Sequence, residues 1–77
     1  MTKTLNVLEI DTDTIDLYKV LKVEGFCSSG GEAKIAIANG EVLVNDEIET
    51  RKRKKIMPGD LIQYSEDKVL IKRRKAV

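Results

Sequence analysis

The stretch from Ser28 to Gly40 constrains the fold most, because it carries the signals that start, fill and end a short helix. Ser29 is followed three residues later by Glu32, which is the capping-box spacing of a helix start. Gly30 and Gly31 lie just inside that start, where each glycine costs up to about 1 kcal/mol relative to alanine. A chain that keeps two glycines here needs a reason for them.

Two interpretations explain the paired glycines. In the first, the missing side chains let a phosphate approach the free amides and the positive end of the helix dipole. Lys34, one turn further on, could then reach the same anion. In the second, the glycines only permit a tight turn between two helices. The stretch alone leaves both interpretations open.

The composition indicates one small ordered domain. The chain has 77 residues, of which 42% are hydrophobic and 35% charged, so residues 1–77 are expected to form a single compact domain. Cys27 is the single cysteine and there is no histidine, which excludes an intramolecular disulfide and a zinc site of the usual ligand types. No metal and no cofactor are predicted. No apolar run of signal or membrane-span length occurs, so we expect a cytoplasmic protein that does not enter a membrane.

The net charge of +1 hides a strong asymmetry along the chain. Residues 1–50 carry four bases and ten acids, whereas residues 51–77 carry ten bases and three acids. The two parts therefore have net charges of −6 and +7. This distribution predicts a polyanion-binding face on an otherwise acidic body.

The first part of the chain reads as a strand followed by two helices. Residues 5–10 are a candidate strand, and a helix is expected to begin at Asp13 or Thr14. Its apolar stripe consists of Leu17, Val20 and Leu21, and Gly25 is placed to end the helix. In the second helix one face consists of Ala33, Ala36, Ile37 and Gly40. Ile35 lies off that face, so it either packs under the N-terminal segment or is exposed.

The second part reads as short strands. Residues 42–44 form a strand that ends in the hairpin-type turn Asn45-Asp46. Further strands are predicted at 61–64, after the turn Pro58-Gly59-Asp60, and at 69–71, after the connection 65–68. Residues 72–77 read as a basic tail. The order of strand, two helices and a small antiparallel sheet predicts the α+β class.

The run from Arg51 to Lys55 is the strongest functional signal in the residues themselves. Five adjacent bases repel one another unless an anion neutralises them, and Arg and Lys are the residues that contact phosphates. A solvated loop without function is the alternative, and the tail Lys72-Arg73-Arg74-Lys75 is equally compatible with solubility alone. Tyr18 and Tyr64 are too few for a single-strand stacking platform, which favours folded or double-helical nucleic acid.

Catalysis is not expected. General acid–base chemistry most often uses histidine, which this chain lacks. Cys27 has no histidine to activate it, so we interpret it as a small buried residue.

A set of residues resembles the S-four RNA-binding domain, also called the alpha-L motif, over about residues 15–65. The residues that carry this resemblance are Leu17, Leu21, Gly25, Phe26, Ser28, Ala33, Gly40, Val42, Val44, Asn45 and Pro58-Gly59-Asp60. A narrower set is similar to small stand-alone bacterial proteins of the YbcJ/YaaA type: Ser29-Gly30-Gly31, Ala33-Lys34, 42–45, 50–56 and Gly59. The resemblance implies two antiparallel helices packed on a small, mainly antiparallel sheet.

The resemblance also implies non-catalytic binding of structured RNA, with ribosomal RNA as the expected ligand. Larger members carry an arginine near the start of the second helix where this chain has Gly30, so the backbone is expected to take over part of that contact. The predicted RNA-binding residues are Ser29, Gly30, Gly31, Lys34, Arg51, Lys52, Arg53, Lys54 and Lys55. A monomer is expected. A protein–protein adaptor that docks the basic loop on an acidic partner, and a duplex DNA binder, stay open as alternatives.

Overall fold

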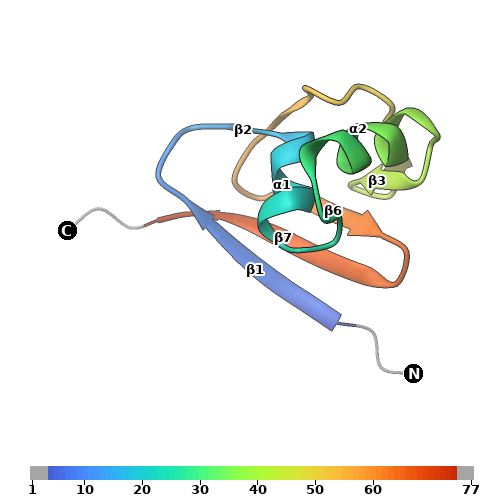
Figure 1. Ribbon diagram of the computed structural model, residues 1–77. Coiled ribbons are helices and arrows are strands. Elements are labelled where there is room, and N and C mark those ends of the chain that lie inside the picture. Colours follow the sequence, from blue (N-terminus) through green and yellow to red (C-terminus); the bar gives the residue numbers. More distant parts are fainter. Residues whose placement is uncertain (1–3, 75–77) are drawn as a thin grey trace.

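The computed structural model describes residues 4–74, and it confirms the α+β class (Figure 1). The elements are β1 (Thr4–Ile10), β2 (Ile15–Asp16), α1 (Leu17–Val23), α2 (Gly30–Ala38), β3 (Val42–Val44), β4 (Glu47–Ile48), β5 (Lys55–Ile56), β6 (Leu61–Tyr64) and β7 (Asp67–Arg73). Figure 1 shows both helices on the same side of the sheet that contains β1, β7 and β6.

The main sheet has five strands in the order β1-β7-β6-β3-β4, and β2 pairs with β5 separately. All pairs are antiparallel except β1 with β7, which run parallel from Thr4 opposite Asp67 to Ile10 opposite Arg73. The predicted mainly antiparallel sheet is therefore confirmed, with one parallel pair that joins the first strand to the last.

The core lies between the sheet and the helices, as the apolar patterns predict. The stripe of α1 is fully buried, and so are Ala33 and Ile37 of α2. Alternate residues of the strands complete this core because successive side chains point to opposite faces of a sheet. The buried residues of the five-stranded sheet are Ile10, Val42, Val44, Ile62, Val69 and Ile71, and Ile56 of β5 is buried as well.

The first helix begins later than predicted. It starts at Leu17 rather than at Asp13 or Thr14, because Ile15 and Asp16 pair with Ile56 and Lys55 as strand β2. The polar turn before it has good cap residues, but pairing with a distant strand overrides that local preference. The predicted end is correct, since Gly25 has φ +77° directly after the C-cap residue Glu24.

The second helix has the predicted start, with one difference in its cap. Ser29 is the N-cap residue, and its hydroxyl accepts a hydrogen bond from the Glu32 amide at 3.1 Å. The Glu32 carboxylate accepts a bond of 2.6 Å from the Ser28 hydroxyl instead of returning to the Ser29 amide, so only half of the capping box forms. Ile35 is 63% exposed, so it lies at the surface and does not pack under the N-terminal segment.

The turns of the β half follow the sequence closely. Asn45 and Asp46 have φ of 52° and 70°, as a hairpin of the predicted type requires. The Asn45 side chain donates to Asp60 at 3.0 Å and accepts from the Leu61 amide at 2.9 Å, so it ties this hairpin to the Pro58-Gly59-Asp60 turn.

The last strand is longer than predicted. It runs from Asp67 to Arg73 because it pairs along its length with β1, so Lys72 and Arg73 belong to a strand rather than to a tail. The connection before it shortens to Ser65 and Glu66. Residues 75–77 of the predicted tail lie outside the described residues.

Candidate nucleic-acid interface

The basic loop is fixed to the start of α1 by its backbone. The amide of Leu17 donates to the carbonyl of Lys54 at 3.0 Å, and the amide of Tyr18 donates to the carbonyl of Lys52 at 3.1 Å. These amides belong to the first turn of α1 and have no partner inside the helix. The loop therefore occupies the start of α1, and its position relative to the helix is set.

Tyr18 brings α2 and the basic loop together. The ammonium of Lys34 lies 4.7 Å from the centre of the Tyr18 ring, and the guanidinium carbon of Arg53 lies 5.6 Å from the same centre. Both distances are within the range of cation–π attraction. Tyr18 is not among the RNA-binding residues predicted from the sequence, because no spacing in the sequence links residues 18, 34 and 53.

The two glycines at the start of α2 are not required by sterics. A Cβ atom at Gly30 would lie 3.7 Å from the Tyr18 ring, and one at Gly31 would lie 3.8 Å from the Ser29 hydroxyl oxygen, which are ordinary contacts. The left-handed backbone of the interhelical turn is at Gly25 instead. This geometry counts against the interpretation that the paired glycines only make a tight turn.

The amides of α2 divide into used and free groups. Glu32 and Ala33 donate to the hydroxyl and the carbonyl of Ser29. Within residues 4–74, the amides of Gly30 and Gly31 have no hydrogen-bond partner. Free amides at a helix start are suited to an anion.

Two of the five predicted loop bases are neutralised inside the protein. Arg51 donates from Nε at 2.9 Å and from its terminal nitrogen at 3.2 Å to the Glu49 carboxylate. These side-chain bonds, together with a bond from the Arg51 amide, lower the pKa of Glu49 to about 2. Lys55 donates to Asp16 at 2.7 Å, and this hydrogen bond is the main reason that the pKa of Asp16 is lowered.

The remaining predicted bases carry unneutralised charge. The four ion pairs found in residues 4–74 include none of Lys34, Lys52, Arg53 and Lys54. Lys52 and Arg53 are exposed, whereas Lys34 and Lys54 are half-buried. The structure thus gathers Lys34 and Arg53 on one ring, beside Gly30, and separates Arg51 and Lys55 into ion pairs.

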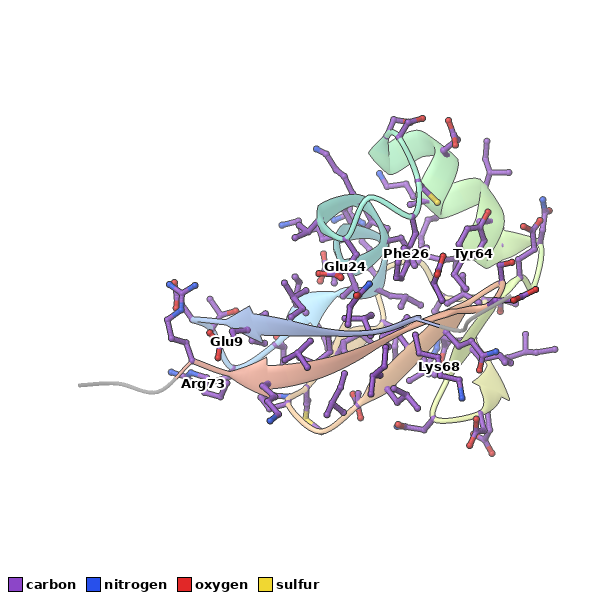
Figure 2. All side chains as sticks on the ribbon, turned by 90° about the horizontal axis from the view of Figure 1, so that it is seen from below. Glu9, Glu24, Phe26, Tyr64, Lys68 and Arg73 are labelled. Atoms are coloured by element: carbon purple, nitrogen blue, oxygen red, sulfur yellow. The ribbon has the colours of Figure 1, made fainter. Side chains whose placement is uncertain are left out.

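Arg73 and Arg74 form ion pairs away from the basic loop. Arg73 contacts Asp13 at 2.6 Å, and Arg74 contacts Asp11 at 3.3 Å. These acids lie in the turn after β1. Figure 2 shows Arg73 and Glu9 near one end of the β1–β7 pair and Lys68 nearer the other end.

Reactive groups of other kinds are scarce in the described part of the chain. Burial raises the pKa of the Cys27 thiol, which disfavours the reactive thiolate form. Figure 2 shows the neighbouring Phe26 and Tyr64 between helices and sheet, with their ring centres 6.4 Å apart.

Residues 4–74 hold no group of three or more His, Cys, Asp and Glu side chains suited to a metal. Over the same residues, no helix has the length and apolar character needed to cross a membrane.

Comparison with known proteins identifies relatives of this arrangement. The model of the S4 domain matches residues 8–72. YbcJ of Escherichia coli (strain K12), designated a candidate RNA-binding protein, is 47% identical over 51 residues, covering 66% of this chain and 73% of YbcJ. RlbA of Bacillus subtilis (strain 168), designated a candidate ribosome maturation protein, is 41% identical over 58 residues, covering 75% of this chain and 82% of RlbA.

A solved structure extends the likeness to the whole fold. The solution structure of E. coli YbcJ, described as revealing an alfaL motif involved in RNA-binding, superimposes with a TM-score of 0.65 at 36% identity. The match covers 94% of this chain and 90% of YbcJ. The resemblance noted from the sequence is confirmed, and the chain belongs to the S4 domain family.

Proposed function

We propose that this chain binds structured RNA through the surface around Tyr18 and catalyses no reaction. Membership of the S4 domain family supports RNA as the ligand, and so does the designation of YbcJ. The observation that carries the proposal is the convergence of Lys34 and Arg53 on one ring, without a carboxylate partner for either in residues 4–74. Cations left without an internal partner are available for phosphates.

The predicted site residues take different roles in this proposal. The free amides of Gly30 and Gly31, next to the cap Ser29, hold one phosphate. Lys34, Lys52, Arg53 and Lys54 supply the attraction directly. Arg51 and Lys55 contribute less, since each must exchange a protein carboxylate for a phosphate.

This division of roles predicts the salt dependence of binding. If the four unpaired cations contact phosphates, log K should fall with log salt at a slope of about −2.8 to −3.6, between the single-strand and duplex coefficients. Participation of Arg51 would add about 0.7 to 0.9 to the magnitude of that slope. Fluorescence anisotropy of a labelled RNA hairpin over a series of salt concentrations measures it.

Ribosomal RNA is the proposed ligand class. The designation of RlbA as a candidate ribosome maturation protein supports this choice. We further propose that residues 1–77 act as a single domain, that the protein is a monomer, and that it works in the cytoplasm. Each of these stays a prediction.

The decisive experiment is crosslinking in cells followed by sequencing of the bound RNA. The test variant replaces two unpaired bases, Arg53→Gln with Lys54→Gln. The matched control replaces Lys68 and Lys72, also by Gln, because strand alternation places these two on the sheet face away from the helices. Both variants remove two positive charges, so they differ mainly in where the lost charges lie.

Reads concentrated on one site of ribosomal RNA in the wild type and the control, but lost in the test variant, would support the proposal. Equal loss in both variants would show that net charge alone causes the binding. No enrichment in the wild type would contradict RNA binding. A partner protein that survives nuclease treatment would then support the adaptor alternative, and equal competition by duplex DNA would support the DNA alternative.

A further inference from the structure

Tyr18 of α1 lies where the basic loop and α2 meet. Its ring is half-buried and faces a cation from each of these two segments. Building on the proposed function, we infer that Tyr18 is a positioning residue, whose ring aligns Lys34 and Arg53 so that both engage the same short stretch of RNA backbone. The ring itself contacts the cations and not the RNA.

The surroundings of Tyr18 hold the ring in place. Its amide is bonded to the carbonyl of Lys52, which fixes the first turn of α1 against the loop. On another side lies Gly30, whose missing side chain leaves the ring uncovered while the backbone of α2 stays close. The backbone of Tyr18 is therefore fixed by the loop, and Gly30 leaves space beside its ring.

Alignment by a ring is useful because Lys and Arg side chains are costly to order. Each loses much rotamer freedom when it is immobilised, and two like charges near each other also repel. The negative face of an aromatic ring attracts both cations and offsets part of these costs before RNA arrives. Binding then requires less ordering, which raises affinity without adding a contact to the RNA.

Two other roles for Tyr18 make different predictions. If the ring stacks on a base, its contribution is independent of the two cations. If the ring only supports the fold, its loss lowers thermal stability and weakens every ligand equally. A double-mutant cycle separates these roles, because only alignment makes the effect of Tyr18 depend on Lys34 and Arg53.

The experiment measures binding of a fluorescein-labelled RNA hairpin and, separately, of inorganic tripolyphosphate. Tyr18→Leu is made in the wild type and in a Lys34→Gln, Arg53→Gln background. We expect Tyr18→Leu to weaken binding of both probes about five- to thirtyfold in the wild type, the range for losing two exposed cation–π contacts. In the double-Gln background it should have no further effect. Tyr18→Phe, which keeps the ring, should bind within about twofold of the wild type.

Two controls keep fold effects apart from alignment. Thermal melting of each variant reports stability. Tyr64→Leu removes another half-buried tyrosine, on which no cation lies within the described residues. Equal weakening by Tyr64→Leu and Tyr18→Leu would overturn the inference, as would an equal effect of Tyr18→Leu in both cation backgrounds.

A readout without RNA makes failure of the inference distinguishable from failure of the proposed function. In NMR spectra of the free protein, the side-chain methylene protons next to the charged groups of Lys34 and Arg53 should show upfield ring-current shifts. These shifts should persist in Tyr18→Phe and vanish in Tyr18→Leu. Their absence from the wild type would overturn the inference even if the hairpin binds. If the shifts are present but the hairpin does not bind, the proposed function fails, and an unchanged tripolyphosphate affinity in Tyr18→Leu would overturn the inference as well.

Discussion

The two helices begin in different surroundings, although both follow a polar residue that is suited to capping. The first-turn amides of α1 donate to the carbonyls of Lys52 and Lys54, and its N-cap residue Asp16 makes no side-chain cap bond. The start of α2 is capped by its own Ser29 and leaves the amides of Gly30 and Gly31 free. One helix start is therefore used for tertiary structure, while the other remains available to a ligand.

This difference shows how a small domain can place a ligand site next to a structural joint. The loop that completes α1 is the same loop that carries the basic run. Its backbone carbonyls accept hydrogen bonds from the first-turn amides of α1, so its side chains are not needed for this contact. The joint thus fixes where Arg53 meets Tyr18 and Lys34.

The largest expected effect comes from loosening the first turn of α1, to which the basic loop is hydrogen-bonded. Leu17 is fully buried, so Leu17→Ala should cost about 2–5 kcal/mol of unfolding free energy and lower Tm by roughly 10 °C or more. RNA affinity should fall as well, because the cavity loosens the first turn of α1, whose amides hold the loop. Leu5→Ala, at a residue that is 63% exposed, should change neither property. Thermal melting and anisotropy measure both, and unchanged RNA affinity in folded Leu17→Ala would show that the loop is positioned in another way.

The cap of α2 is expected to matter more for stability than that of α1. Ser29→Ala removes the bond to the Glu32 amide and should cost about 0.5–2 kcal/mol. Asp16→Asn should have the smaller effect, because Asp16 makes no cap bond and only its pair with the exposed Lys55 side chain is weakened. Urea unfolding of the two variants compares them directly. The reverse order would mean that the β2–β5 pairing depends on the Asp16 carboxylate.

The glycines of α2 should separate folding from binding. Gly31→Ala should stabilise the protein by about 0.5–1 kcal/mol, because the backbone is helical and a Cβ atom there has room. A bulkier change, Gly31→Leu, should weaken RNA binding more than folding by blocking the free amides. Melting and binding curves for the two variants decide the matter. Equal loss of stability and affinity in Gly31→Leu would return this glycine to a structural role.

The smallest expected effect concerns the pH dependence of the Glu49–Arg51 pair. The pKa of Glu49 is about 2 in the folded protein, below the value of 4.5 for the free side chain. The stabilisation is therefore fully present above pH 4.5 and is lost as the pH falls through the folded pKa. Urea unfolding of wild type and Glu49→Gln should show a stability difference that narrows over this range. A difference that stays constant with pH would contradict the role of this carboxylate.

Local signals in the sequence determined much of the fold. Apolar spacing identified the buried stripe of α1, Ser29 identified the start of α2, and Gly25 identified the end of α1. The Asn45-Asp46 turn was also predicted from these two residues alone. Each of these features is encoded within a few neighbouring residues, where periodicity, capping and left-handed backbone preferences act directly.

The basic character of the second part of the chain follows from its composition, whereas the contact that each base makes depends on the tertiary structure. Pairing of β2 with β5 moved the start of α1 to Leu17, and pairing of β1 with β7 absorbed part of the predicted tail. The same packing placed Lys55 beside Asp16 and Arg53 on Tyr18. These partners are far apart in sequence, so their contacts depend on how the whole core closes and leave no local pattern to read.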